Sequence, residues 1–215
     1  MARVKVCGIT NLDDATHAVE AGAWALGMIF APESVRRCDL GEAARIGGEL
    51  HRRVELAGVF VNATLDEVAA TADACSLSLV QLHGDEGPAY CAEVARRTGA
   101  RIIKAVRARD KASIRSLGAY RDRVDFHLVD AWVEGRSGGT GETFDWELLG
   151  ERHSQVPLIV SGGITPDNAG EAVTRLRPFA VDSASGTEAE HGRKDPAKVT
   201  ALIRAVEQAS RVAAA

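Results

Sequence analysis

The stretch Leu158-Ile-Val-Ser-Gly-Gly-Ile-Thr-Pro-Asp-Asn168 places a short apolar run, a glycine pair and a helix start signal next to one another. The apolar run predicts a strand, and Pro166 is typical of the first position of a helix. A strand that leads through a tight turn into a helix is the repeating unit of proteins with a parallel sheet. This stretch therefore indicates an α/β fold if the same unit recurs along the chain.

The same unit does recur along the chain of 215 residues. Asn11 and Asp39 are capping residues before helical patterns, and Thr64 with Glu67 forms a capping box. Asp195-Pro196 again places proline at the first helical position. The eight predicted strands are Arg3–Cys7, Ala25–Phe30, Leu56–Phe60, Leu79–Leu82, Ile102–Val106, Phe126–Asp130, Leu158–Ser161 and Phe179–Asp182.

Eight strand–helix units predict a single (β/α)8 TIM barrel that occupies residues 1–215 as one catalytic domain. The length is at the short end for that fold. An open, doubly wound sheet shows the same alternation, so periodicity alone leaves it as the alternative.

Composition excludes several classes of partner. The formal net charge is -4, and 46% of the residues are hydrophobic, which is ordinary for a globular protein. We expect no nucleic-acid partner and no membrane partner, because no basic excess and no apolar stretch of about 20 residues is present. The four cysteines form no CxxC pair and no zinc-finger spacing, so we expect reduced thiols, no metal and a cytoplasmic protein.

The active site of a TIM barrel lies at the carboxyl ends of its strands, and polar residues occur there in this chain. Lys5 and Cys7 alternate onto one face of the first strand, although a free cysteine is more often a small buried hydrophobe. Asp130 ends the sixth strand and precedes a glycine-rich loop rather than a helix. It is a candidate functional residue, with a helix- or turn-capping aspartate as the alternative.

Two further strand ends carry candidate substrate-binding residues. Arg36 follows the second strand and could bind a carboxylate bidentately, or be a solvated loop charge. Gln81 and His83 alternate onto one face at the end of the fourth strand. A structural, hydrogen-bonded histidine is the alternative for His83.

The loops after the last two strands predict a phosphate site. Gly162 and Gly163 follow the seventh strand. Asp182 ends the eighth strand, and Ser185 and Gly186 follow it. Phosphate sites of TIM barrels commonly use these two loops, because glycine lets backbone N–H groups approach the oxygens. The alternative is a pair of tight turns that need glycine for a positive φ. The glycine-rich segment 138–141 after the sixth strand could close over a ligand or be a simple loop.

Taken together in chain order, a set of short segments resembles the phosphoribosylanthranilate isomerase family over residues 1–205. The segments are Lys5-Val-Cys-Gly-Ile-Thr10, Gly27-Met-Ile-Phe30, Pro32-Glu-Ser34 with Arg36, Gly58-Val-Phe-Val-Asn62, Val80-Gln-Leu-His-Gly84, Asp130, Gly138-Gly-Thr-Gly141, Thr143-Phe-Asp-Trp146, Ser161-Gly-Gly163, Pro166-Asp-Asn168, Val181-Asp182 through Gly186, and Lys194-Asp-Pro196.

The resemblance implies an Amadori rearrangement of N-(5-phosphoribosyl)anthranilate in tryptophan biosynthesis, without a cofactor. By this likeness Cys7 is the general base, Asp130 is the general acid and Arg36 holds the anthranilate carboxylate. The remaining roles implied are substrate contacts for Lys5, Gln81, His83 and Asp182, and phosphate contacts for Gly162, Gly163, Ser185 and Gly186. A phosphosugar is the expected small-molecule partner, and the assembly is expected to be a monomer or a homodimer.

Some positions depart from the family pattern. Arg37 stands where an aromatic residue is usual, Glu142 where lysine is common, and Ser183-Ala184 differs from the usual loop after the eighth strand. One alternative is the related isomerase of histidine biosynthesis, which has aspartate where this chain has Cys7. The other is a non-catalytic phosphosugar-binding barrel, which would not need to retain the acid and the base.

Overall fold

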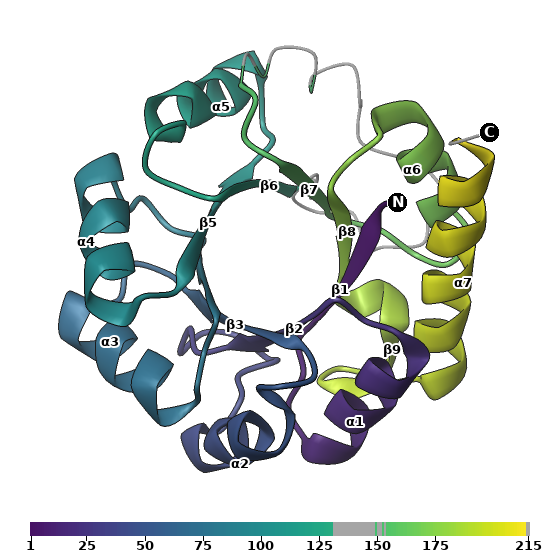
Figure 1. Cartoon of the computed structure of the whole chain (residues 1–215), viewed down its shortest axis with the longest axis horizontal. Coiled ribbons are helices and arrows are strands. Elements are labelled where there is room, and N and C mark those ends of the chain that lie inside the picture. The colour runs from purple at the N-terminus through teal and green to yellow at the C-terminus, as the bar shows by residue number, and fades with distance from the viewer. Residues whose placement is uncertain (131–148, 150–151, 153, 214–215) are drawn as a thin grey trace.

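Eight parallel strands close into a barrel in the computed structural model, which describes residues 1–130, 149, 152 and 154–213 (Figure 1). Each strand pairs with the next, and the last pairs back with the first through Lys5 and Asp182. This closure confirms the predicted TIM barrel and excludes the open sheet. The strands are β1 (Arg3–Cys7), β2 (Ala25–Ile29), β3 (Glu55–Phe60), β4 (Leu79–Leu82), β5 (Arg101–Arg107), β6 (Phe126–Asp130), β7 (Leu158–Ser161) and β8 (Ala180–Ser183).

Helices surround the barrel on the outside (Figure 1). Three of the predicted caps are present: Asn11 accepts from the backbone N–H of Asp14, Asp39 caps the second helix, and Thr64 with Glu67 forms a capping box. The helices are α1 (Leu12–Ala21), α2 (Leu40–Leu50), α3 (Leu65–Ala74), α4 (Pro88–Thr98), α5 (Lys111–Ser116), the 3-10 turn η1 (Leu117–Tyr120), α6 (Ala169–Leu176), the 3-10 turn η3 (Ser185–Thr187) and α7 (Pro196–Val212).

One predicted helix start is wrong. Pro196 does begin α7, but α6 begins at Ala169, so Pro166 lies in a turn ahead of the helix. The side-chain oxygen of Asn168 accepts from the backbone N–H of Thr165 at 2.9 Å, and its amide donates to the Gly163 carbonyl at 2.8 Å. Asn168 thus stabilises a turn of its own, and the helix starts only after it.

Aromatic side chains close one rim of the barrel. At the amino ends of the strands, Trp24 packs against Phe126 and Phe179 with ring centroids 5.7 and 5.1 Å apart, and Arg3 lies over the Phe179 ring. This apolar cluster closes one end of the barrel. The interior above it is lined by small and aliphatic side chains: Ala25, Ala57, Leu79, Ile103, Ala105, Leu128, Ile159 and Ala180.

A short hairpin that the sequence did not predict follows η3. Its strands are β9 (Glu188–Glu190) and β10 (Arg193–Lys194), which pair antiparallel just before α7. All four cysteines are free and buried. Within the described ranges, none of the helices is long and apolar enough to cross a membrane.

Candidate active site

A buried ion pair lies inside the carboxyl rim, where β1 and β8 meet. The Lys5 Nζ donates to Asp182 Oδ1 at 2.8 Å, and the two side chains are 0% and 5% exposed. Ser161 at the end of β7 donates to the other oxygen of Asp182 at 3.1 Å. Because its charge is balanced by Lys5 and both its oxygens accept hydrogen bonds, Asp182 is fixed in one orientation.

The thiol of Cys7 lies beside this pair, on the same strand face as Lys5, as the alternation predicted. Burial raises the pKa of Cys7 above its ordinary value, while the Lys5 ammonium, through its charge and a hydrogen bond, opposes that rise. Gly27 on β2 leaves room for both groups, since a Cβ at that position would lie 2.6 Å from the Cys7 Sγ and 3.0 Å from the Lys5 Nζ. The barrel therefore holds a thiol next to an ammonium group that stabilises its anion.

Asp130 lies at the carboxyl end of β6, with His83 facing it. The His83 Nε2 is 3.6 Å from Asp130 Oδ2, and Gln81 Nε2 is 3.4 Å from His83 Nδ1. Burial, followed by the nearby charge of Arg107, lowers the pKa of His83 to about 4, so the imidazole is neutral at pH 7. Asp130 thus faces a neutral ring and not a histidinium.

The loops after β7 and β8 lie against each other. Ser183 donates to the Ile164 carbonyl at 2.7 Å, and Gly186 approaches that carbonyl so closely that a Cβ there would overlap it. Gly162 and Gly163 have φ of 88° and 67°, so the turn after β7 needs glycine at both positions for its backbone conformation. The close approach also brings Ile164, which follows these glycines, to the 3-10 turn η3, whose first residue is Ser185. Backbone N–H groups of this kind suit a phosphate.

Arg36 is bonded within the protein. Its Nε and Nη2 donate to the two carboxylate oxygens of Glu188 at 2.7 and 2.8 Å. Glu188 belongs to the unpredicted hairpin, and no pattern in the sequence pointed to it. A bidentate ion pair with a buried carboxylate excludes the interpretation of Arg36 as a freely solvated loop charge.

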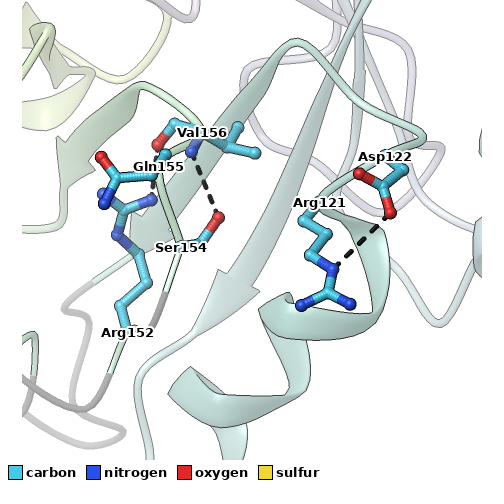
Figure 2. Close-up of a pocket in the computed structure, with 6 residues that line it drawn as sticks. All are labelled: Arg121, Asp122, Arg152, Ser154, Gln155 and Val156. Carbon is cyan, nitrogen blue, oxygen red and sulfur yellow. Dashed lines mark hydrogen bonds and ion pairs between the residues drawn. The ribbon is translucent and has the colours of Figure 1, made fainter.

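A hollow of about 570 Å³ lies elsewhere on the molecule. It is lined by Arg121, Asp122, Arg152, Ser154, Gln155 and Val156 (Figure 2). These residues precede β6 and β7, so the hollow lies at the amino ends of those strands, on the rim opposite to Cys7. Arg121 there pairs with Asp122 at 3.6 Å, and Arg152 donates to the Val156 carbonyl. The acid and the base that were predicted from the sequence are therefore both remote from it.

The predicted glycine-rich segment 138–141 and the departure at Glu142 lie outside the described residues. The candidate site residues that the structure does describe gather at one rim of the barrel, although they come from six different strands or strand ends. They are Lys5, Cys7, Arg36, Gln81, His83, Asp130, Gly162, Gly163, Asp182, Ser185 and Gly186.

Comparison with known proteins decides the family. The model of the N-(5'-phosphoribosyl)anthranilate isomerase family matches residues 4–205. The chain belongs to this isomerase family. It is 49% identical over 203 residues to the N-(5'-phosphoribosyl)anthranilate isomerase of Citrifermentans bemidjiense, which covers 94% of this chain and 96% of that protein. The chain is therefore an isomerase of tryptophan biosynthesis.

Solved isomerases have the same fold. One crystal structure of phosphoribosyl anthranilate isomerase is a complex with reduced 1-(o-carboxyphenylamino)-1-deoxyribulose 5-phosphate; it is 38% identical, with a TM-score of 0.85, and covers 97% of this chain and 100% of its own. Another, of monomers generated from the dimeric isomerase of Thermotoga maritima, is 37% identical, with a TM-score of 0.84 and the same coverage. Their isomerase fold is thus shared along nearly the whole chain.

Proposed function

We propose that this isomerase converts N-(5-phosphoribosyl)anthranilate to 1-(2-carboxyphenylamino)-1-deoxyribulose 5-phosphate, with Asp130 as general acid and Cys7 as general base. The observation that carries the proposal is the family match over residues 4–205 on a barrel with both residues at its carboxyl rim. The length of the match also supports the interpretation of the chain as one catalytic unit.

The first step falls to Asp130. Its carboxyl proton passes to the furanose ring oxygen, the bond between that oxygen and C1 breaks, and the nitrogen lone pair forms the C1=N bond of an iminium. A carboxyl group must be protonated to act in this way, and the ring that faces it, His83, is neutral. Gln81 donates to His83 Nδ1, which favours the tautomer with its proton on Nε2, toward Asp130.

The second step falls to Cys7. Its thiolate removes the proton from C2 of the sugar, and the electron pair neutralises the iminium to give an enolamine, which then tautomerises to the ketone. The buried thiol is a weak acid, so the anion depends on the Lys5 ammonium beside it. Lys5 is itself kept charged: burial would lower its pKa, but Asp182 and Cys7 outweigh that effect and raise it. Asp182 thereby acts on the base through Lys5.

Two anchors would hold the substrate across the mouth of the barrel. Arg36 is the cation for the anthranilate carboxylate, and the N–H groups of Gly162, Gly163, Ser185 and Gly186 are the donors for the phosphate. Binding at two ends fixes the sugar between Asp130 and Cys7, which supplies the orientation that such a reaction needs. Four free cysteines support a reducing compartment, and we infer that the enzyme acts in the cytoplasm.

The experiment is a turnover assay with freshly made N-(5-phosphoribosyl)anthranilate, followed by the loss of its fluorescence. We expect wild type to turn over, and we expect Cys7→Ser and Asp130→Asn each to lower kcat on the order of 10² to 10⁴-fold. Arg36→Met should mainly raise KM. An inactive wild type, or undiminished turnover in the two acid–base variants, contradicts the proposal.

A further inference from the structure

We propose that Glu188 is a positioning residue that presents Arg36 to the carboxylate of the substrate. The inference rests on the proposed function, because it takes Arg36 as the carboxylate anchor. Glu188 itself would not touch the substrate; it would determine how tightly the aromatic carboxylate binds by fixing the plane of the guanidinium. The hairpin β9–β10 then becomes part of the specificity machinery rather than a connection to α7.

The geometry of the guanidinium carries the argument. A guanidinium group has two edges that can each meet a carboxylate with two parallel N–H donors. Glu188 takes the edge formed by Nε and Nη2, at 2.7 and 2.8 Å. Among the described residues none accepts from Nη1, and the other contact of Nη2 is His191 Nδ1 at 3.2 Å, on a side chain that is 76% exposed. The edge formed by Nη1 and Nη2 is therefore presented to a second carboxylate.

Glu188 is itself held firmly. Glu188 is only 7% exposed. Its carboxylate accepts from the Gly192 backbone N–H at 3.3 Å and lies 3.7 Å from the Lys194 ammonium. The Lys198 ammonium donates to the Glu188 carbonyl at 2.8 Å, which fixes the main chain as well. Burial alone would raise the pKa of Glu188, but the hydrogen bond from Arg36 and the charges of Lys194 and Arg36 outweigh it and lower the pKa. The carboxylate is thus charged and immobile at neutral pH.

The stem of Arg36 is held from the other side. Its Cδ lies only 3.0 Å from where a Cβ would stand on Gly8, which has a φ of 77° at the end of β1. The arginine therefore packs between the backbone that follows Cys7 and the carboxylate of Glu188. With stem and head both fixed, little side-chain entropy remains to be lost when the substrate binds.

The same hairpin also reaches the predicted phosphate loop. The Lys194 ammonium donates to the Ala184 carbonyl at 2.9 Å, and the Lys194 backbone N–H donates to Asp14 at 2.8 Å. The side chain of Glu188, however, bonds to the arginine, and only its backbone N–H meets that loop, at the Ser185 carbonyl, a contact that a side-chain substitution leaves in place. A change at Glu188 should therefore weaken recognition of the carboxylate and leave recognition of the phosphate intact, which a general loss of structure would not do.

The test uses Glu188→Gln, which keeps the size of the side chain but removes its charge. We expect KM to rise about tenfold while kcat stays within about threefold, as for lost ground-state binding. Anthranilate and inorganic phosphate, used as competitive inhibitors, report the two ends separately. The inhibition constant of anthranilate should rise with KM, and that of phosphate should stay within about twofold.

Two controls make the result decisive. Glu190→Gln changes an exposed carboxylate on the same hairpin and should alter neither constant. In an Arg36→Met background, Glu188→Gln should raise KM no further, because its effect passes through the arginine. If Glu188→Gln does not fold, Glu188→Asp, which withdraws the carboxylate by one methylene, should show the same selective loss.

Unchanged anthranilate inhibition in the folded Glu188 variants, or equal weakening of both inhibitors, overturns the inference while the proposed function stands. Additive losses in the Arg36→Met background overturn it as well. A wild type that does not turn over the substrate contradicts the proposed function instead.

Discussion

Gly27 is the position where the smallest change should do the most damage to the reaction. A Cβ built there would lie 2.6 Å from the Cys7 Sγ, 3.1 Å from the Cys7 Cα and 3.0 Å from the Lys5 Nζ. Ordinary van der Waals contact begins near 3.4 Å, so Gly27→Ala forces the sulfur to move by about 0.8 Å. The obstacle includes backbone on β1 and is therefore not relieved by rotation of a side chain alone.

The size of the effect follows from that displacement. Overpacking a filled interior by one methyl group costs about 1–3 kcal/mol of stability. A reacting group that is misplaced by about 1 Å loses on the order of 10²-fold in rate. We therefore expect Gly27→Ala to lower kcat on the order of 10²-fold while the protein stays folded. KM should change little, since both proposed anchors are elsewhere.

The assay combines the fluorescence measurement of turnover with urea unfolding. Gly48→Ala is the matched control, because a Cβ on Gly48 in α2 would meet nothing within 4 Å. Alanine there should raise stability by about 0.5–1 kcal/mol, with kcat unchanged. If Gly27→Ala keeps the wild-type kcat, Cys7 is not a reacting group whose position is fixed by close packing, and the reasoning is refuted.

Three further predictions follow from other buried groups. Glu86→Gln should lower the free energy of unfolding by about 3 kcal/mol, because it removes the partner charge of the Lys104 ammonium, which is 2% exposed and 2.8 Å from Glu86. Urea unfolding measures this loss, and a change below about 1 kcal/mol contradicts the prediction. Burial, with Arg152 nearby, lowers the pKa of His127 from 6.5 to about 4, so the unfolded state binds the extra proton and stability should fall as pH falls from 6.5 to 4. His127→Gln should reduce that slope by up to about 1.4 kcal/mol per pH unit, and an identical slope in the variant counts against it. Because burial raises the pKa of the Cys7 thiol above its ordinary value, the thiolate fraction and kcat should increase with pH between 7 and 9. A pH-independent kcat in that range speaks against a thiolate base.

The strands could be predicted from the sequence because each is a short β-branched run bounded by a turn signal. The predicted β1, β4, β6 and β7 have the observed bounds, and the other four strands differ only at their ends. Helix starts with a capping side chain were also predictable. The predicted helix start at Pro166 is wrong because proline suits a turn as well as the first position of a helix, and no neighbouring residue distinguishes the two. Barrel closure depends on pairing between β1 and β8, which are at opposite ends of the chain.

The candidate site could be predicted only in part, for a similar reason. Alternation along one strand places Lys5 beside Cys7 in β1, and Gln81 in β4 beside His83 directly after it. The partners of Lys5 and Arg36, which are Asp182 and Glu188, come from sequence positions more than 150 residues away. Contacts of that separation follow from the closed fold and not from any local pattern.

The acid and the base are the central claim, and the kcat of the Cys7→Ser/Asp130→Asn double variant tests it most directly. If Asp130 opens the ring and Cys7 then removes the C2 proton, the two act in successive steps of one turnover, and the slower step alone sets the rate. The fluorescence assay should then give a double variant with a kcat within a few-fold of the slower single variant. Losses that multiply would mean that the two groups act on the same step, and a double variant as fast as wild type would mean that neither acts at all.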